Sequence, residues 1–322
     1  MDLNNSIFDV SVIMATYNSV WEKCVFTLES ITGQHGINLE LIVVDDGSAD
    51  NMFDRFAEYL HVKGFENFRL IESKDSKGTL KNYYEGVSVA KGNYLKLISP
   101  GDALFSDTIL SNWVRELNES RLCWSFGNAV YYHYVENRPA VVREPAFPRI
   151  IDCYSTNNAE TCRWNYVVLE DVALGAALLC ETDIFLNYLI KFLGQIKYAE
   201  DVVFNALMYD GFLPLFYDSN VIFYEYGSGV STGEKKWKNL IQVDLRNAEI
   251  VIANFNRKDA LQTRMSKALI SMNSASQKRK RILKNFKKGG MKKVLKFRFN
   301  PRLSSDDITG CGTWWEDYEH RN

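Results

Sequence analysis

Three groups of acidic residues stand where they could perform chemistry. Asp45 and Asp46 open a turn before Gly47-Ser48, Asp102 closes a second turn, and Glu200-Asp201 precedes an apolar helical run. Carboxylates can accept hydrogen bonds from a base or ribose, hold a metal beside phosphates, or act as a general base. These three groups are therefore the candidate positions for ligand binding and proton transfer.

The elements that must position the first group are two apolar strands. Residues 10–15 run into Thr16-Tyr17-Asn18, and residues 39–44 run into Asp45-Asp46; a helix-period segment follows each. Short apolar strands that alternate with helices predict a parallel sheet covered on both faces. In such sheets ligands bind beyond the carboxyl ends of the strands, where the strand order reverses. Both polar clusters fall at that edge.

A third unit extends the pattern. Residues 68–71 predict a strand, and Ser76 is expected to cap a helix from Lys77 to about Lys91, with Gly92 as its stop. A strand at 94–98 then leads into the acidic turn of residues 99–102. Three β-α units in a row favour a nucleotide-binding α/β domain.

This series resembles the nucleotide-sugar half of family-two glycosyltransferases. The resemblance rests on the run 11–18, the Val-Val-Asp-Asp-Gly-Ser turn, and Gly78 and Gly86 followed by residues 90–94 before the acidic turn. It covers residues 8–105 strongly and residues 170–232 weakly. It implies an α/β fold: a GT-A-like single large domain with a mostly parallel central sheet, followed by a C-terminal helical and basic extension.

The resemblance also implies a donor site. In the family an acid at Asp45 or Asp46 accepts a hydrogen bond from the base or ribose of the nucleotide. Thr16 and Tyr17, with Asn18 beside them, would form the wall of the base pocket, where Tyr17 could stack on a base. The alternative is an Asp-Gly turn without a ligand, because both residue types favour turns.

The acidic turn departs from the family pattern. The family has Asp at positions 99, 101 and 102, whereas this chain has Ser99, Gly101 and Asp102. The family uses this turn to hold Mg²⁺ or Mn²⁺, which would leave Asp102 as the metal ligand here. A plain β-turn is the alternative, and metal dependence is open.

A second departure from the family pattern is the absence of an arginine. Where the family has Ala-Arg-Asn, this chain has Asn82-Tyr83-Tyr84. Lys77 or Lys81 could replace the missing Arg near the nucleotide, although Lys81 is two positions away and faces elsewhere on a helix. Solvated lysines are the alternative.

Glu200-Asp201 resembles the Glu-Asp pair that performs the reaction in the family. The resemblance implies that Asp201 takes the proton of the acceptor hydroxyl in one inverting displacement, while Glu200 orients or contacts the acceptor. The alternative is an acidic pair stabilised by a helix N-terminus. Glu170-Asp171 is a rival pair. Ser231 lies in a glycine-containing stretch, 224–232, which would close over the diphosphate; a surface turn is the alternative.

Composition sets the outer limits. The 322 residues carry a net charge of −2, which argues against a general polyanion binder such as a nucleic-acid protein. The six cysteines form no Cys-x-x-Cys pair, so we expect free, mostly buried thiols in a reducing cytosol and no zinc site. With neither a signal sequence nor a membrane span apparent, we expect a cytoplasmic protein that is soluble or peripheral on the membrane.

The chain is expected to divide into a nucleotide-sugar subdomain at 1–105, an acceptor and catalytic subdomain at 106–233, and a helical extension at 234–322. Residues 136–165 contain three prolines and predict a long loop, and residues 234–272 predict one or two long helices. Residues 278–302 hold twelve Lys or Arg and no acid. Interleaved apolar residues make this basic segment suitable for an anionic membrane surface. Nucleic-acid binding and a merely solvated tail are the alternatives.

Together these features predict an inverting glycosyltransferase that moves a sugar from a nucleoside diphosphate to a glycan, often lipid-linked. One rival is a sugar-phosphate nucleotidyltransferase, but residues 16–20 are not the glycine-rich and basic loop that it needs. The other rival is a non-catalytic module that binds sugar nucleotides or glycans, which the thinned acidic turn would suit.

Overall fold

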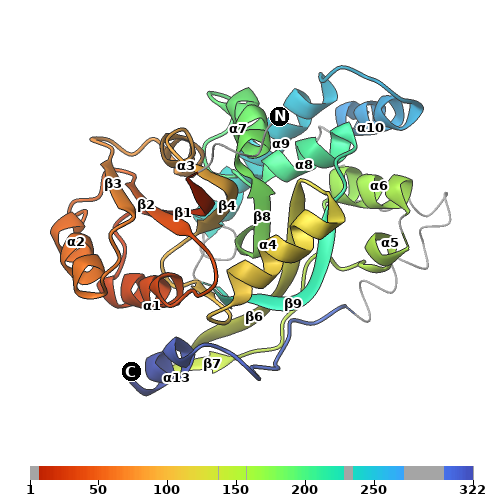
Figure 1. The fold of residues 1–322 in the computed structure, drawn as a ribbon. Coiled ribbons are helices and arrows are strands. Elements are labelled where there is room, and N and C mark those ends of the chain that lie inside the picture. Colours follow the sequence, from red (N-terminus) through yellow and green to blue (C-terminus); the bar gives the residue numbers. More distant parts are fainter. Residues whose placement is uncertain (1–6, 137, 157, 228–234, 272–300, 322) are drawn as a thin grey trace.

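A computed structural model describes residues 7–136, 138–156, 158–227, 235–271 and 301–321. The chain folds around one nine-stranded sheet in the order β3-β2-β1-β4-β8-β6-β9-β5, with β7 paired to β6 (Figure 1). Helices cover both faces of this sheet. The predicted α/β class and single large domain are therefore confirmed.

The N-terminal half of the sheet is parallel. Four strands and three helices alternate in it, namely β1 (Phe8–Thr16), α1 (Trp21–Thr32), β2 (Leu39–Asp45), α2 (Phe53–Val62), β3 (Phe68–Glu72), α3 (Thr79–Val87) and β4 (Gly92–Ile98). Every residue of β2 is buried, as expected for a strand covered on both faces. Because β1 lies between β2 and β4, the strand order reverses there, and the carboxyl ends of β1 and β4 form the crevice that the sequence predicts.

The second half of the sheet is mixed. It contains β5 (Ala103–Leu104), β6 (Trp124–Val135), β7 (Arg138–Val141), β8 (Leu178–Glu181) and β9 (Leu215–Glu225). Only β6 and β9 are parallel here, while β8 runs antiparallel to both of its neighbours. The parallel character predicted for the whole sheet is thus concentrated in its first half.

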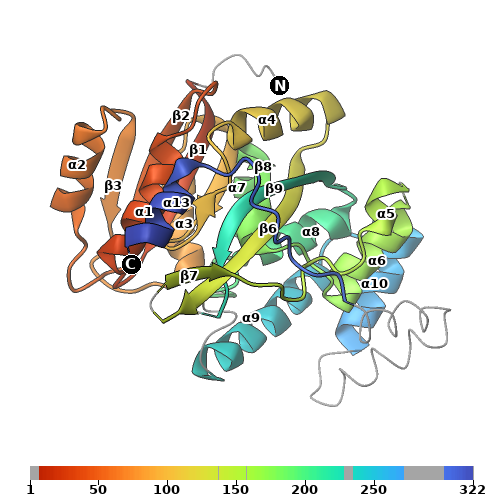
Figure 2. The same cartoon turned by 90° about the horizontal axis from the view of Figure 1, so that it is seen from below.

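Two apolar layers hold the helices to the sheet (Figure 2). One layer packs α1 and α2 together with α4 (Ile109–Ser120). The other packs α3 with α6 (Ala159–Leu169), α7 (Thr182–Leu189), α8 (Val202–Asp210), α9 (Lys235–Ala253) and α10 (Ala260–Ser271). The described residues 235–271 therefore form two helices, one of the two outcomes expected for residues 234–272.

The prediction of a long loop at residues 136–165 is wrong. This region holds β7, α5 (Asp152–Ser155) and the start of α6, and Cys153 and Cys162 are buried in the core. Pro139 is compatible with β7 because this is an edge strand, where a missing N–H breaks no ladder bond. Pro139 thus lies in an edge strand, and Pro145 and Pro148 lie in the connection from β7 to α5.

The expected start of the third helix is also wrong. The helix begins at Thr79, with Gly78 as its N-cap at φ +91°, and it ends at Val87. The Ser76 hydroxyl donates to Asp46 Oδ2 at 2.8 Å and is therefore not available as a cap. A tertiary contact has replaced the local cap that the sequence indicates.

The C-terminal segment returns to the N-terminal half of the domain. Helix α13 (Thr313–Arg321) packs on α1 and β7 (Figures 1 and 2). Tyr318 stacks on Phe26 at 3.9 Å between ring centroids, and Trp315 stacks on Phe223 at 4.2 Å. Although this segment follows the basic stretch in the chain, it completes an aromatic core and does not extend away from the domain.

Arg302, the last residue of the predicted basic segment, is likewise part of the folded domain. Its guanidinium donates to Asn128 and to Pro148 O and lies over the Phe216 ring. The other eleven Lys and Arg of that segment lie outside the described residues. The division at residues 105 and 233 stays a prediction.

All six cysteines are free thiols, and four of them are buried, as predicted. Within the part of the chain that the structure describes, no helix combines the length and the apolar character needed to cross a membrane.

Candidate active site

The carboxyl ends of β1 and β2 are tied together by side chains. Asp45 Oδ1 accepts hydrogen bonds from the Thr16 hydroxyl at 2.9 Å and from the Ser48 hydroxyl at 2.6 Å. Asp45 Oδ2 accepts from the Ser48 backbone N–H at 2.7 Å. Both Thr16 and Asp45 are buried. These two predicted donor-binding residues therefore give the edge of the sheet a fixed shape.

Asp46 joins the end of β2 to the start of α3 by hydrogen bonds. Its carboxylate accepts from the backbone N–H of Lys77 at 2.6 Å and from that of Gly78 at 3.0 Å. This places the N-terminus of α3 at the same edge. Tyr17, by contrast, is half exposed, so its ring is available for stacking. Asn18, at φ +46°, accepts from Ala49 N–H and braces the neighbouring turn.

The acidic turn is a hydrogen-bonded β-turn whose carboxylate points inward. The backbone N–H of Asp102 donates to Ser99 O at 3.0 Å. Asp102 Oδ1 accepts from Glu225 N–H at 3.3 Å, and the side chain is buried. Burial raises the pKa of Asp102 to about 7. The carboxylate is thus engaged by β9 at the back of the turn.

A divalent cation does not fit the residues at this turn. Glu225 is the nearest second carboxylate, and both of its oxygens accept from Lys23 Nζ, at 2.6 and 2.7 Å. The described residues contain no group of three or more His, Cys, Asp or Glu placed to hold a metal ion. Mg²⁺ and Mn²⁺ can be held by one or two carboxylates together with phosphates and water, but here the single carboxylate of the turn accepts from Glu225 N–H, and the Lys23 ammonium occupies both oxygens of Glu225.

Lys96 is a buried cation that the sequence reasoning missed. Its ammonium donates to Leu97 O at 2.8 Å and to Ala176 O at 2.6 Å, so it connects β4 with the short helix at Gly175–Ala177. Burial lowers the pKa of Lys96 to about 7. A charged residue inside an otherwise apolar, doubly covered strand was the available signal.

Tyr83, at the middle position of the family's Ala-Arg-Asn, lies between the acidic turn and the Glu-Asp pair. It is buried, and its hydroxyl donates to Ile98 O at 3.2 Å. Burial, followed by the nearby charges of Glu200 and Asp102, raises the pKa of Tyr83. Both acidic groups therefore lie near one side chain, although a hundred residues separate them in sequence.

Glu200 and Asp201 are half-buried at the start of α8. Asp201 is the N-cap residue and its side chain makes no capping hydrogen bond, although the backbone N–H groups of Asp201 and Val202 favour its charged form. Burial raises the pKa of both carboxyl groups, and the charge of Asp201 raises that of Glu200 further. The pair therefore has the perturbed chemistry that is typical of a catalytic site.

The rival pair Glu170-Asp171 has a structural function. Asp171 is buried and accepts from the backbone N–H groups of Arg149 at 2.7 Å and Ile150 at 3.0 Å. Its carboxylate fixes the connection that leads into α5. This leaves Glu200-Asp201 as the stronger candidate.

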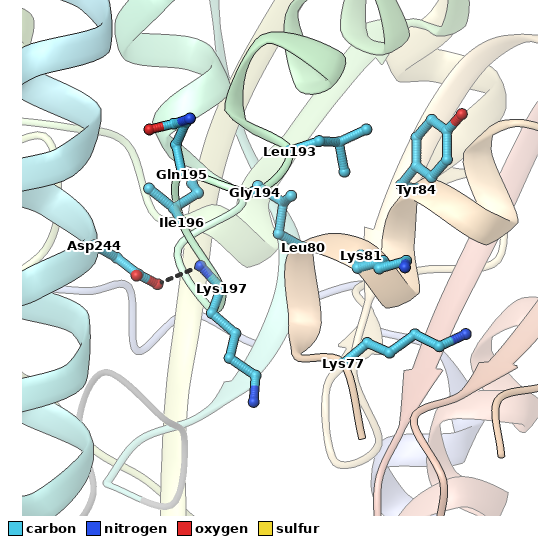
Figure 3. A pocket seen from close by; sticks show the side chains of 10 residues that line it. All are labelled: Lys77, Leu80, Lys81, Tyr84, Leu193, Gly194, Gln195, Ile196, Lys197 and Asp244. Carbon is cyan, nitrogen blue, oxygen red and sulfur yellow. Dashed lines mark hydrogen bonds between the residues drawn. The ribbon is translucent and has the colours of Figure 1, made fainter. Parts of the chain in front are cut away.

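The loop before Glu200 is held by Asp244 of α9. Asp244 Oδ2 accepts from the backbone N–H groups of Lys197, Tyr198 and Ala199, at 3.0, 2.5 and 3.2 Å. Figure 3 shows the first of these bonds. Three consecutive N–H groups that converge on one oxygen fix the backbone immediately before the pair. Sequence reasoning missed Asp244, which lies 43 positions after Asp201 in an ordinary amphipathic helix.

A pocket of about 600 Å³ lies between α3 and this loop (Figure 3). Lys81, a predicted donor contact, lines it together with Lys77, Tyr84 and Lys197. Lys77 forms an ion pair with Glu85 at 2.9 Å. Lys81 thus lies on the pocket side of α3, whereas Tyr83 is buried toward the sheet. Ser231 lies outside the described residues.

Comparisons with known proteins agree with this architecture. Residues 11–159 match the model of glycosyl transferase family 2. Glycosyltransferase GlyG of Streptococcus pneumoniae serotype 4 is 27% identical over 128 residues, which is 40% of this chain and 40% of that protein. The chain therefore matches about two fifths of this curated relative.

Two solved structures share the fold. S. aureus TarS in complex with UDP-GlcNAc superposes with a TM-score of 0.54 at 16% identity, over 81% of this chain and 71% of that one. The mannosyltransferase PcManGT of Pyrobaculum calidifontis, in complex with GDP-Man and Mn²⁺, gives a TM-score of 0.56 at 14% identity, over 90% and 81%. The fold is thus that of GT-A glycosyltransferases, and the chain carries a family-2 glycosyl transferase domain. This confirms the family that the sequence motifs predict.

Proposed function

We propose that this protein transfers one sugar from a nucleoside diphosphate to an acceptor hydroxyl with inversion at the anomeric carbon. The observation that carries the proposal is that Asp102 and Glu200, the neighbour of Asp201, both lie near Tyr83, at the edge where Thr16 and Asp45 end their strands. A donor that spans this edge would lie with its nucleotide over β1 and β2 and its sugar near Asp201. Family membership and the solved complexes of the two neighbours with nucleotide sugars support this assignment.

Asp201 acts as the general base. Its carboxylate takes the proton of the acceptor hydroxyl while that oxygen attacks the anomeric carbon, and the bond from this carbon to the phosphate oxygen breaks. The nucleoside diphosphate leaves with the bonding electron pair. A half-buried carboxylate with no capping hydrogen bond suits this step. Glu200, whose raised pKa favours the neutral form, donates a hydrogen bond to the acceptor.

The donor is bound by the residues at the carboxyl edge. Tyr17 stacks on the base, and Asp45 and Asp46 use their remaining lone pairs for the base or ribose. Lys81 and Ser231 contact the donor from α3 and from the stretch after β9. No step is assigned to Mg²⁺ or Mn²⁺, because the described residues of the acidic turn do not fit such an ion.

The acceptor is a glycan carried on a lipid, as in bacterial polysaccharide assembly. Eleven Lys and Arg at residues 278–298 would hold the protein peripherally on an anionic membrane, at its cytoplasmic face. Nothing else in the chain favours a nucleic acid.

The test is a thermal-shift screen of the purified protein against nucleoside diphosphates and their sugars, followed by donor turnover. We expect the nucleoside diphosphate of one base to raise the melting temperature of the protein. We expect the protein to consume a sugar nucleotide that carries the same base. Consumption of a nucleoside triphosphate together with a sugar phosphate would instead favour a nucleotidyltransferase. Binding without turnover, even when glycan acceptors are supplied, would favour a binding module.

A further inference from the structure

The acidic turn is joined to α1 by backbone contacts. Lys23 lies in the first turn of α1, the helix that follows β1 in the chain. The backbone N–H of Gly101 donates to Lys23 O at 3.2 Å, and the Thr27 hydroxyl donates to Asp102 O at 2.7 Å. The start of α1 and the turn therefore form one rigid unit at the proposed donor edge.

An ion pair lies at the position where a second acid of the turn would stand. Glu225 of β9 is buried and accepts both of its hydrogen bonds from the Lys23 ammonium, whose side chain is 27% exposed. A Cβ added at Gly101 would lie 2.6 Å from Glu225 Oε2, and Gly101 has φ +99°. Space and backbone conformation thus both disfavour a side chain at position 101, and the ion pair fills the place of a metal-binding carboxylate.

The Lys23 ammonium retains the capacity to bind an anion. A lysine has three N–H donors, and the two oxygens of Glu225 account for two of them. The N-cap residue of α1, Val20, makes no side-chain capping bond, so no side chain of the cap occupies the first backbone amides of this 12-residue helix. An ammonium beside uncapped helix amides is an arrangement that suits phosphate oxygens.

Lys96 is a second lysine close to Asp102 of the turn. It is fully buried in β4, six residues before Asp102, and its ammonium is oriented by Leu97 O and Ala176 O. Two lysines therefore lie near the turn, where the family pattern has additional acids.

We propose that Lys23, held by Glu225, supplies the positive charge that faces the diphosphate of the donor, so that this protein binds its donor and transfers its sugar without a divalent metal ion. The proposal rests on the proposed function, since it concerns the same donor. As the glycosidic bond breaks, the negative charge that develops on the leaving diphosphate oxygen is stabilised by the Lys23 ammonium and the amides of α1.

The first experiment measures binding of the nucleoside diphosphate identified in the screen, by titration calorimetry with full-length protein. We expect the same dissociation constant for the nucleotide, within about twofold, in EDTA and in about 1 mM Mn²⁺. Electron paramagnetic resonance of Mn²⁺ should show no more bound ion with protein and nucleotide together than with the nucleotide alone.

The second experiment removes the ion pair. The double variant Lys23→Gln/Glu225→Gln leaves no unpaired buried charge, and we expect it to melt near the wild-type temperature yet bind the nucleotide at least ~10-fold more weakly, a loss of about 1.4 kcal/mol. Lys63→Gln, at the end of α2, is the matched control and should bind as the wild type does.

The outcomes separate the two proposals. Donor binding that is lost in EDTA and restored by Mn²⁺ would overturn metal independence and leave the glycosyltransferase assignment intact. The same would follow if the double variant bound the nucleotide as tightly as the wild type. No binding of any nucleotide, with or without metal, would overturn the proposed function and this inference with it.

Discussion

The carboxylate of Asp244 lies 2.5 Å from the backbone nitrogen of Tyr198, and the same oxygen accepts hydrogen bonds from the residues on either side. Helix α9, which the sequence presents as an extension beyond the catalytic region, thereby fixes the loop that carries Glu200-Asp201. Helix α9 is therefore part of the candidate site and is not an appendage to it.

Replacing Asp244 by Ala should lower kcat by ~10- to 100-fold and leave the KM for the donor nearly unchanged. Three N–H groups, of which that of Ala199 is buried, would lose their acceptor, at about 1–3 kcal/mol of stability, and the base would lose its position. Asp244→Asn retains one acceptor oxygen and should recover much of the activity. Gln242→Ala, exposed on the same helix, is the control. Equal losses of kcat in the Asn and Ala variants would argue against positioning.

Asp201→Asn should bind the donor normally and turn over ~10²- to 10⁴-fold more slowly, because the amide cannot accept the acceptor's proton. Calorimetry checks the binding, and release of nucleoside diphosphate checks the rate. Glu170→Gln, from the rival pair, should behave as the wild type does. If Asp201→Asn turned over at a near-normal rate, another residue would have to be the base.

Stability should depend on pH through Glu200. Burial and Asp201 raise its pKa to about 8, against about 4.3 in an unfolded chain. Between these values the folded state holds the proton and the unfolded state does not, so the free energy of unfolding falls as pH rises. Glu200→Gln abolishes this loss.

We therefore expect the melting temperature of Glu200→Gln to equal that of the wild type near pH 5 and to exceed it increasingly up to pH 8–9. Thermal melts followed by circular dichroism measure this difference, with the exposed Glu119→Gln as the control. A difference between variant and wild type that stays constant across this pH range would contradict the raised pKa.

Trp315→Ala should destabilise the fold by about 3–5 kcal/mol, the usual cost of removing a buried aromatic ring. Trp315 is 1% exposed and packs against Phe223 and Tyr132. Val62→Ala, at an 81% exposed position, should change stability by less than about 0.5 kcal/mol. Denaturant titration measures both variants. A Trp315 variant as stable as the wild type would show that α13 is dispensable to the core.

Neutralising the eleven Lys and Arg of residues 278–298 to Gln should abolish binding to anionic vesicles at low salt while nucleotide binding persists. Each charge near such a surface contributes up to ~1 kcal/mol, and salt screens it. Charge replacement is preferable to truncation, because a truncation would also remove Trp315 and Tyr318 from the core. Equal vesicle co-sedimentation of variant and wild type at 50 and 500 mM salt (about a threefold change in Debye length) would remove the membrane function.

Local patterns in the sequence were sufficient for the N-terminal half of the fold. The strand 39–45 is a mostly apolar run that is followed by turn residues, and this pattern depends on neighbours within a few positions. The same reasoning correctly predicted two helices after residue 234 as one of two outcomes. It failed at residues 136–165, because an edge strand tolerates proline and a local reading cannot tell which strand lies at an edge.

The sequence by itself determined the α/β class, the family and the candidate acids, since each of these is written in short motifs and in their spacing. Only the tertiary structure decided what the acids do. In the structure the carboxylate of Asp102 accepts from Glu225 N–H, and that of Asp171 accepts from Arg149 N–H. The side chain of Asp201 makes no helix-capping hydrogen bond. The pairs Lys23–Glu225 and Asp244–Tyr198 join residues 202 and 46 positions apart. Such contacts arise from the order of strands in the sheet and from helix packing, and no local pattern encodes them.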